Sequence, residues 1–120
     1  MSGKPIFISY RRQESIVEAR AVYERLERDF PQQVFIDLGS LEYGTDFVAE
    51  LDSQLDGCQL MLVLIGPGWL TSTDPTGKRR IDRDTDFVRI ELSAALRRKV
   101  RVIPVLLNEA QMPESTDLPA

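Results

Sequence analysis

The stretch Phe7-Ile-Ser-Tyr-Arg-Arg12 sets the interpretation of the whole chain. It begins as a short apolar run, typical of a buried strand, and passes into a polar loop without a glycine-rich phosphate turn. In an open α/β sheet, ligands bind at the loops that follow the carboxyl ends of the strands. Tyr10 could therefore stack against an anionic ligand, to which Arg11 and Arg12 would supply two positive charges.

Apolar runs alternate with helical patterns through the rest of the chain. The apolar runs predict four strands, at residues 5–9, 34–36, 60–65 and 100–107. Helical spacing predicts a helix at residues 14–29, a second from a cap at Thr45 to a stop at Gly57, and a third from a cap at Asp84 or Thr85 to about Lys99. This alternation predicts an α/β fold, a doubly wound parallel sheet of the flavodoxin-like type with strand order 2-1-3-4-5.

The length of 120 residues predicts one domain, spanning residues 1–120. Residues 109–120 are polar and contain two prolines, which is typical of a loop. A fifth strand and a closing helix, usual in a sheet of this kind, have no counterpart in the sequence. We therefore expect a domain that is truncated at its C-terminus or excised from a larger protein.

The composition excludes several classes of protein. A net charge of −4 argues against a nucleic-acid-binding module, which would usually carry a basic face. The longest apolar stretch, residues 60–65, is far too short to span a membrane, and no signal segment opens the chain. The single cysteine, Cys58, rules out an internal disulfide and fits a reducing compartment. We expect a cytoplasmic protein without a membrane or nucleic-acid partner.

The chain contains no histidine. It therefore lacks the usual general base, the Ser-His and Cys-His nucleophile systems, and the commonest metal ligand. Carboxylates, arginines and backbone dipoles would have to perform any chemistry. We accordingly expect neither a metal site nor a bound cofactor.

The predicted strand order places a candidate crevice between the first and third strands. The loop at Tyr10, Arg11 and Arg12 would lie on one side, and the loop at residues 66–69 on the other. Tyr10 and Trp69 could form aromatic walls, and either arginine could bind a phosphate bidentately. The alternative, equally open from the sequence, is that the arginines are solvated and Trp69 caps the core.

Glu91 is the sharpest candidate for a functional carboxylate. It falls at the edge of the apolar stripe of its predicted helix, a stripe formed by Val88, Leu92, Ala95 and Leu96. No cationic residue lies one helical turn before or after it. An acidic side chain in such a setting is either functional, or reaches water, or pairs with a residue distant in sequence.

Four stretches together resemble a TIR (Toll/interleukin-1 receptor) domain of the NAD-cleaving bacterial branch. They are Phe7-Ile-Ser-Tyr-Arg-Arg12, Val34-Phe-Ile-Asp37, Leu41-Glu-Tyr-Gly44 and Asp86-Phe-Val-Arg-Ile-Glu91. The similarity extends from about Lys4 to Leu107. It implies that Glu91 is the catalytic glutamate of the family's Trp-x-x-x-Glu pattern, with Phe87 in the tryptophan position.

The resemblance also implies further site residues. The substrate NAD+ would contact Tyr10, Arg11, Arg12, Asp37, Leu41, Gly44, Trp69 and Phe87. The family's BB loop, which lies over the active site and mediates contacts between TIR domains, corresponds to Asp37, Leu38, Gly39, Ser40, Leu41, Glu42, Tyr43 and Gly44. Its two glycines allow positive φ and hinge-like movement. The plain alternative for this segment is a strand–helix connector.

The implied activity is that of an NAD+ nucleosidase in immune or antiphage defence signalling, activated by self-association that can extend to filaments. Nicotinamide leaves as a neutral base, so one carboxylate that stabilises an oxocarbenium-like ribose would suffice. The product, ADP-ribose or a cyclic isomer, is left open. The rival interpretations are a non-catalytic TIR interaction module and a nucleoside-processing glycosyltransferase. This chain lacks the acidic residues that a response-regulator receiver requires and the glycine motif that a Rossmann dehydrogenase requires, so both classes are set aside.

Overall fold

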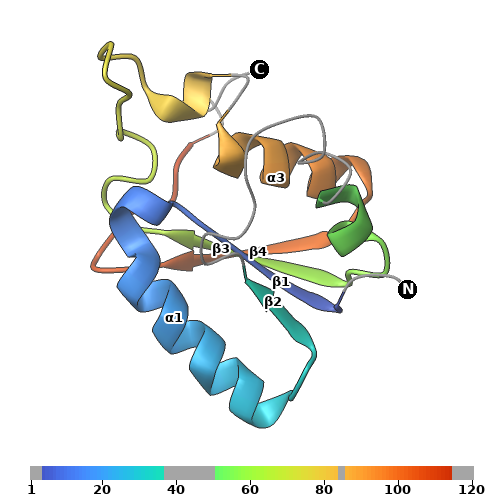
Figure 1. Ribbon diagram of the computed structural model, residues 1–120. Coiled ribbons are helices and arrows are strands. Elements are labelled where there is room, and N and C mark those ends of the chain that lie inside the picture. The colour runs from blue at the N-terminus through green and yellow to red at the C-terminus, as the bar shows by residue number, and fades with distance from the viewer. Residues whose placement is uncertain (1–3, 37–50, 84–85, 115–120) are drawn as a thin grey trace.

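The computed structural model describes residues 4–36, 51–83 and 86–114, which form one sheet with helices on both sides (Figure 1). The strands are β1 (Ile6–Tyr10), β2 (Val34–Ile36), β3 (Leu60–Ile65) and β4 (Arg101–Leu106). The helices are α1 (Arg12–Asp29), the short 3-10 helix η1 (Arg80–Asp82) and α3 (Phe87–Arg97), and residues 51–55 are also helical. The strands are parallel in the order β2-β1-β3-β4. The predicted flavodoxin-like fold class is thus confirmed.

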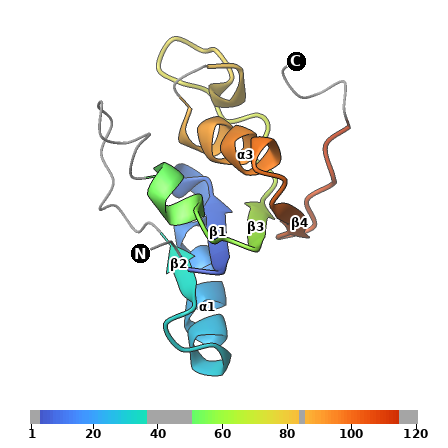
Figure 2. The same ribbon diagram turned by 90° about the vertical axis from the view of Figure 1, so that its right-hand side faces the viewer.

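The helices cover opposite faces of the sheet, with α1 below it and α3 above it in Figures 1 and 2. Successive residues of a strand point to opposite faces, so a strand apolar at every position supplies both cores. The core on the α1 side contains Ile8, Tyr10, Ala19, Val34 and Leu64. The core on the α3 side contains Phe7, Leu51, Leu55, Met61, Val63, Ile65, Trp69, Ile81, Val88, Ala94 and Ala95.

The turn from β1 into α1 is tighter than the sequence predicts. The helix begins at Arg12 instead of residue 14, because the carbonyl oxygen of Arg11 accepts bonds from the backbone N–H groups of Glu14 and Ser15, at 3.0 and 2.9 Å. Ser15 departs from helical geometry, with φ −122° and ψ 24°, which kinks this first turn. Arg12 therefore belongs to the start of a helix and not to a loop.

The predicted cap of α3, at Asp84 or Thr85, is wrong by one or two residues. Asp86 is the N-cap, and its carboxylate accepts a bond from the backbone N–H of Arg89 at 3.1 Å. The predicted core stripe is also rotated. Leu96 is 60% exposed, whereas Glu91 is one of the buried residues of the helix, 6% exposed.

Strand β4 is an edge of the sheet in the part of the chain that the structure describes. The backbone N–H of Leu107 donates to the carbonyl of Ile65 at 2.9 Å, so the alternation of the strand directs the nitrogen of Pro104 away from β3. A proline is tolerated at that position because no ladder bond is lost. Residues 107–114 contain no further helix or strand, and among the described helices none is long and apolar enough to cross a membrane.

Candidate functional site

Glu91 lies on the face of α3 that packs against β1. The Ser9 hydroxyl donates a hydrogen bond of 2.9 Å to Oε1 of Glu91, and both side chains are buried. Ser9 points to this face because it alternates with Ile8 and Tyr10, which point to the α1 side. A hydrogen bond to an ionised carboxylate is stronger than one between neutral groups. The bond therefore holds Glu91 beside the carboxyl-terminal half of β1.

Arg11 is enclosed in the fold, with only 1% of its surface exposed. Its guanidinium binds the Asp86 carboxylate through two nitrogens, at 2.8 and 3.2 Å. Its Nε donates to the carbonyl oxygen of Trp69 at 3.0 Å. Neither placement that the sequence left open, a phosphate ligand in the crevice or a solvated position, describes Arg11. Its predicted contact with substrate is corrected to a structural contact between β1, α3 and the segment after β3.

Arg12 lies nearer the surface than its neighbour. The central guanidinium carbon of Arg12 is 5.7 Å from the centre of the Phe87 ring, within the range of a cation–π interaction. Both side chains are partly exposed. Phe87 opens α3, about one helical turn before Glu91. The structure thus places Arg12, at the start of α1, beside Phe87, which lies one helical turn before Glu91 on α3.

The two predicted aromatic walls are buried instead. Tyr10 is 7% exposed and packs in the core on the α1 side, across the sheet from Glu91. Trp69 is 2% exposed and packs in the core on the α3 side. Trp69 thus follows the alternative in which it caps the core. The alternation of side chains along β1 directs the Tyr10 ring inward, and the turn after β3 directs the Trp69 ring inward.

A second carboxylate, which the sequence analysis missed, lies between the loops after β1 and β3. Oε2 of Glu14 accepts a hydrogen bond from the backbone N–H of Gly68. A Cβ atom on Gly66 would lie 2.6 Å from Oε1 of Glu14, and one on Gly68 would lie 2.5 Å from Oε2. A side chain at either glycine would therefore displace the Glu14 carboxylate, and an acidic group occupies this part of the predicted crevice.

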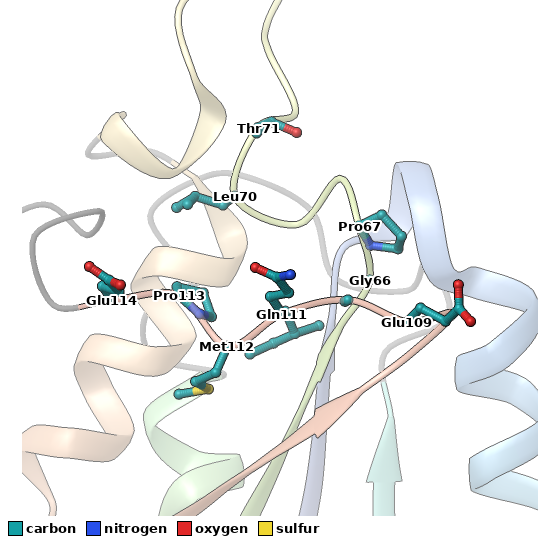
Figure 3. Close-up of a pocket in the computed structure, with 11 residues that line it drawn as sticks. Gly66, Pro67, Leu70, Thr71, Glu109, Gln111, Met112, Pro113 and Glu114 are labelled. Atoms are coloured by element: carbon teal, nitrogen blue, oxygen red, sulfur yellow. The ribbon is translucent and has the colours of Figure 1, made fainter.

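A pocket of about 470 Å³ lies farther along the same edge of the sheet (Figure 3). Its walls are the segments that follow β3 and β4, including Pro67, Leu70, Met112 and Pro113. Arg12, Phe87 and Glu91 are not among its lining residues. The pocket shares Gly66 and Pro67 with the crevice predicted between the first and third strands, but its other wall is the segment after β4 and not residues 10–12.

The polar segment after β3 is ordered by its own charged groups. The carboxylate of Asp74 accepts bonds from the Thr76 hydroxyl at 2.6 Å and from the Arg83 guanidinium at 2.7 Å, and these bonds hold the pKa of Asp74 well below its usual range. Arg79 binds Asp82 bidentately at 2.8 and 2.9 Å and lowers the pKa of that carboxyl. Arg79 and Arg83 are therefore paired with carboxylates of the same segment.

The remaining predicted residues lie outside the described part of the chain. These are Asp37, Leu41 and Gly44 as substrate contacts, and the whole 37–44 loop. The sequence analysis missed Ser9 as the hydrogen-bond partner of Glu91 and Asp86 as the partner of Arg11. Ser9 is the one small polar side chain in the apolar strand β1, and this signal could have identified it. Among the described residues, no cluster of His, Cys, Asp or Glu side chains could hold a metal ion.

A family model described as a TIR domain matches residues 6–119, nearly the whole chain. A search of curated proteins found no match. The matched region contains the parallel sheet, the Ser9–Glu91 contact and the buried Arg11–Asp86 pair. With its fold and the extent of this match, the chain belongs to the TIR domain family.

Proposed function

We propose that this TIR domain is an NAD+ nucleosidase in which Glu91 is the catalytic carboxylate. The observation that supports the proposal best is the placement of Glu91, buried against β1, bound by the Ser9 hydroxyl and one turn from Phe87. A carboxylate held in a fixed orientation at a site of low polarity interacts strongly with a developing positive charge. Such an arrangement suits a transition state in which a ribose becomes cationic.

The proposed reaction breaks the bond between the nicotinamide nitrogen and C1′ of the ribose. The bonding electrons leave with nicotinamide, which becomes neutral and requires no acid catalyst. The carboxylate of Glu91 stabilises the oxocarbenium-like ribose and accepts a hydrogen bond from a ribose hydroxyl. Water then attacks C1′ and releases a proton to give ADP-ribose, or an adenine nitrogen attacks to give a cyclic isomer.

Arg12 and Phe87 are the proposed contacts for the rest of the substrate. The guanidinium of Arg12 is suited to a phosphate of NAD+, and the ring of Phe87 to stacking against a base or sugar. Asp37, Leu41 and Gly44 remain proposed contacts from the loop at residues 37–44. Tyr10, Arg11 and Trp69 are left out because Tyr10 packs in the core on the other face of the sheet, Arg11 binds Asp86 and the Trp69 carbonyl, and the Trp69 ring packs in the core on the α3 side.

Membership of the family also supports a proposal about assembly and context. We propose that the domain acts in defence signalling inside the cell, and that contacts between TIR domains through the 37–44 loop activate it. If the domain only mediates such contacts, without cleaving NAD+, Glu91 would be dispensable for its function. The interaction-module alternative therefore makes the opposite prediction for a substitution at this residue.

The decisive experiment measures nicotinamide release from NAD+ by the domain held at high local density, for example by tethering to beads. We expect Glu91→Gln to lower the rate at least ~100-fold, comparable to the loss of one electrostatic stabiliser in other enzymes. Glu24→Gln is the matched control, because Glu24 is exposed on α1. That variant should keep the wild-type rate within about twofold, since exposed charges contribute little to a distant site.

A clustered wild-type domain that releases no nicotinamide would replace this proposal with the interaction module. Free nucleosides serve as a second substrate set in the same assay. Faster cleavage of nucleosides than of NAD+ would indicate the glycosyltransferase alternative.

A further inference from the structure

We infer that Arg11 is a positioning residue, which fixes the orientation of Glu91 by binding the N-cap of α3. The inference rests on the proposed function, because it assigns Arg11 a role in the catalysis attributed to Glu91. Arg11 and Arg12 are adjacent in sequence, yet only Arg12 lies beside a predicted substrate contact. Arg11 instead binds Asp86, the residue at which α3 begins.

Two contacts attach α3 to β1 and to Arg11, the extended residue that directly follows it. One joins Ser9 to Glu91, and the other joins Arg11 to Asp86. The strand positions are two residues apart, about 6.6 Å along a strand. The helix positions are five residues apart, about 7.5 Å along a helix. The two spacings agree closely and run in opposite directions, so both contacts can form only when α3 has one axial position and one rotation against β1.

The Arg11–Asp86 contact is built for a single geometry. Two guanidinium nitrogens meet two carboxylate oxygens in a planar, bidentate arrangement, and the third donates to the Trp69 carbonyl. Asp86 meanwhile accepts the backbone N–H of Arg89, which ties the ion pair to the first turn of the helix. Both charged groups are buried, so solvent screens the pair little.

This contact explains a feature that helix periodicity alone did not predict. The apolar stripe would turn Leu96 inward and leave Glu91 at its edge. In the structure Leu96 is exposed and Glu91 is buried. The polar contacts at Asp86 and Glu91 therefore decide the rotation of α3 at the cost of one apolar side chain left in water.

The test is the variant Arg11→Lys, which keeps the charge but cannot reproduce the bidentate fork or the bond to Trp69. On the clustered domain we expect kcat for NAD+ to fall at least tenfold while KM stays within about twofold, because the substrate contacts remain. The control Arg12→Lys should show the opposite division, with KM raised and kcat little changed. Asp86→Asn is the second variant, since asparagine still caps the helix but carries no charge.

Partial unfolding would also lower kcat, so two further readouts separate the interpretations. Fluorescence of Trp69, the single tryptophan, gives the folded fraction of each variant. Arg11→Lys is then combined with Glu91→Gln. If Arg11 acts through Glu91, adding Arg11→Lys to the Glu91→Gln variant leaves the residual rate of the folded fraction unchanged. If Arg11 has only a general structural role, the residual rate falls by the same factor as in the wild-type background, and the inference is overturned.

A failure of the proposed nucleosidase function can be distinguished from a failure of the positioning role of Arg11. If the wild-type domain releases no nicotinamide, the nucleosidase proposal is lost. Backbone amide NMR of Arg11→Lys and Asp86→Asn then tests whether Arg11 positions Glu91. Shifts confined to Ser9 and the residues of α3 support the positioning of Glu91 by Arg11. Spectra of both variants in which the Ser9 and Glu91 amides keep their wild-type shifts overturn it.

Discussion

Glu14, near the start of α1, and Gly68, after β3, are in close contact. The carboxylate of Glu14 receives the Gly68 N–H, and a methyl group on Gly68 would lie 2.5 Å from that carboxylate. Gly68→Ala should therefore displace Glu14 and lose the same hydrogen bond that Glu14→Ala removes. A bond to a charged group contributes about 1.5–3 kcal/mol, and we expect each substitution to lower the free energy of unfolding by about 2 kcal/mol.

The prediction is checked by urea unfolding of both single variants and the double variant. Because the two substitutions remove one interaction, the double variant should lose clearly less than the sum of the single losses. Gly77→Ala is the control, since Gly77 has φ +88° and open space around its Cβ position. The loss of unfolding free energy caused by strain in Gly77→Ala should add fully to the loss caused by Glu14→Ala. If the losses of Gly68→Ala and Glu14→Ala add fully, Gly68 and Glu14 do not stabilise each other.

The sequence predicted individual residues unevenly. Glu91 could be selected because a lone carboxylate beside an apolar stripe is unusual. Arg11 and Arg12 could not be separated by composition, since the difference between them is the direction of the side chain relative to a sheet. Strand alternation from Ser9 would have directed Arg11 inward, but the partner that satisfies it, Asp86, is 75 residues away. Such long-range pairing has no local signal.

At the scale of elements, the segment between β3 and α3 depends on ionised carboxylates. Thr76 and Arg83 stabilise the charged form of Asp74, whose folded-state pKa is depressed below the ordinary value of 3.8. A depressed pKa contributes stability above the ordinary value, and this contribution is lost as the pH falls through the folded-state value. We therefore expect the local structure of this loop to be unchanged from neutral pH to about pH 4 and to weaken only below it.

The amide resonance of Thr76 reports this titration, because its N–H donates to Asp74 at 2.9 Å. The midpoint in the wild-type domain should lie below 3.8. Thr76→Val removes the hydroxyl that contributes most to the shift, so its midpoint should move up toward the ordinary value. Asp74→Asn should abolish the titration at this amide. A wild-type midpoint at or above the ordinary value would contradict the interpretation.

The elements themselves were predicted well where apolar patterns are strong. The strands at 34–36 and 60–65 have the predicted bounds, α1 differs from prediction at its start, and α3 differs by one or two residues at each end. The two starts have different causes. Asp86 begins α3 where Arg11 binds it, a contact 75 residues apart that cannot be read from the sequence around the helix. The early start of α1 is local, because the Arg11 carbonyl accepts the backbone N–H groups of Glu14 and Ser15.

At the scale of the whole molecule, the alternation of strands and helices sufficed to predict the parallel sheet. Short crossover connections leave few topologies, and right-handed packing places helices on both faces. The crevice was predicted less well, because its walls are loops whose side chains turn into the core. Tyr10 and Trp69 are aromatic residues at the right sheet edge, but burying each ring removes a large apolar surface from water.

The last prediction concerns the activity of assembled chains. If contacts between TIR domains complete or stabilise the site, nicotinamide release per chain should rise with protein concentration and with tethering. Each chain carries a net charge of −4, so like charges oppose association at low ionic strength. Raising the ionic strength from about 0.01 M to about 0.15 M shortens the screening length from about 30 to about 8 Å. The concentration at which the rate per chain is half-maximal should therefore fall.

Rates are measured over a wide range of chain concentrations at both ionic strengths, with Glu91→Gln as the inactive control. Light scattering on the same samples relates the rate to the size of the assembly. A turnover per chain that is constant from dilute monomer upward would show that one chain contains a complete site. In that case the positioning of Glu91 by Ser9, Arg11 and Asp86 would be sufficient for catalysis without a neighbour, because all four residues belong to the same chain.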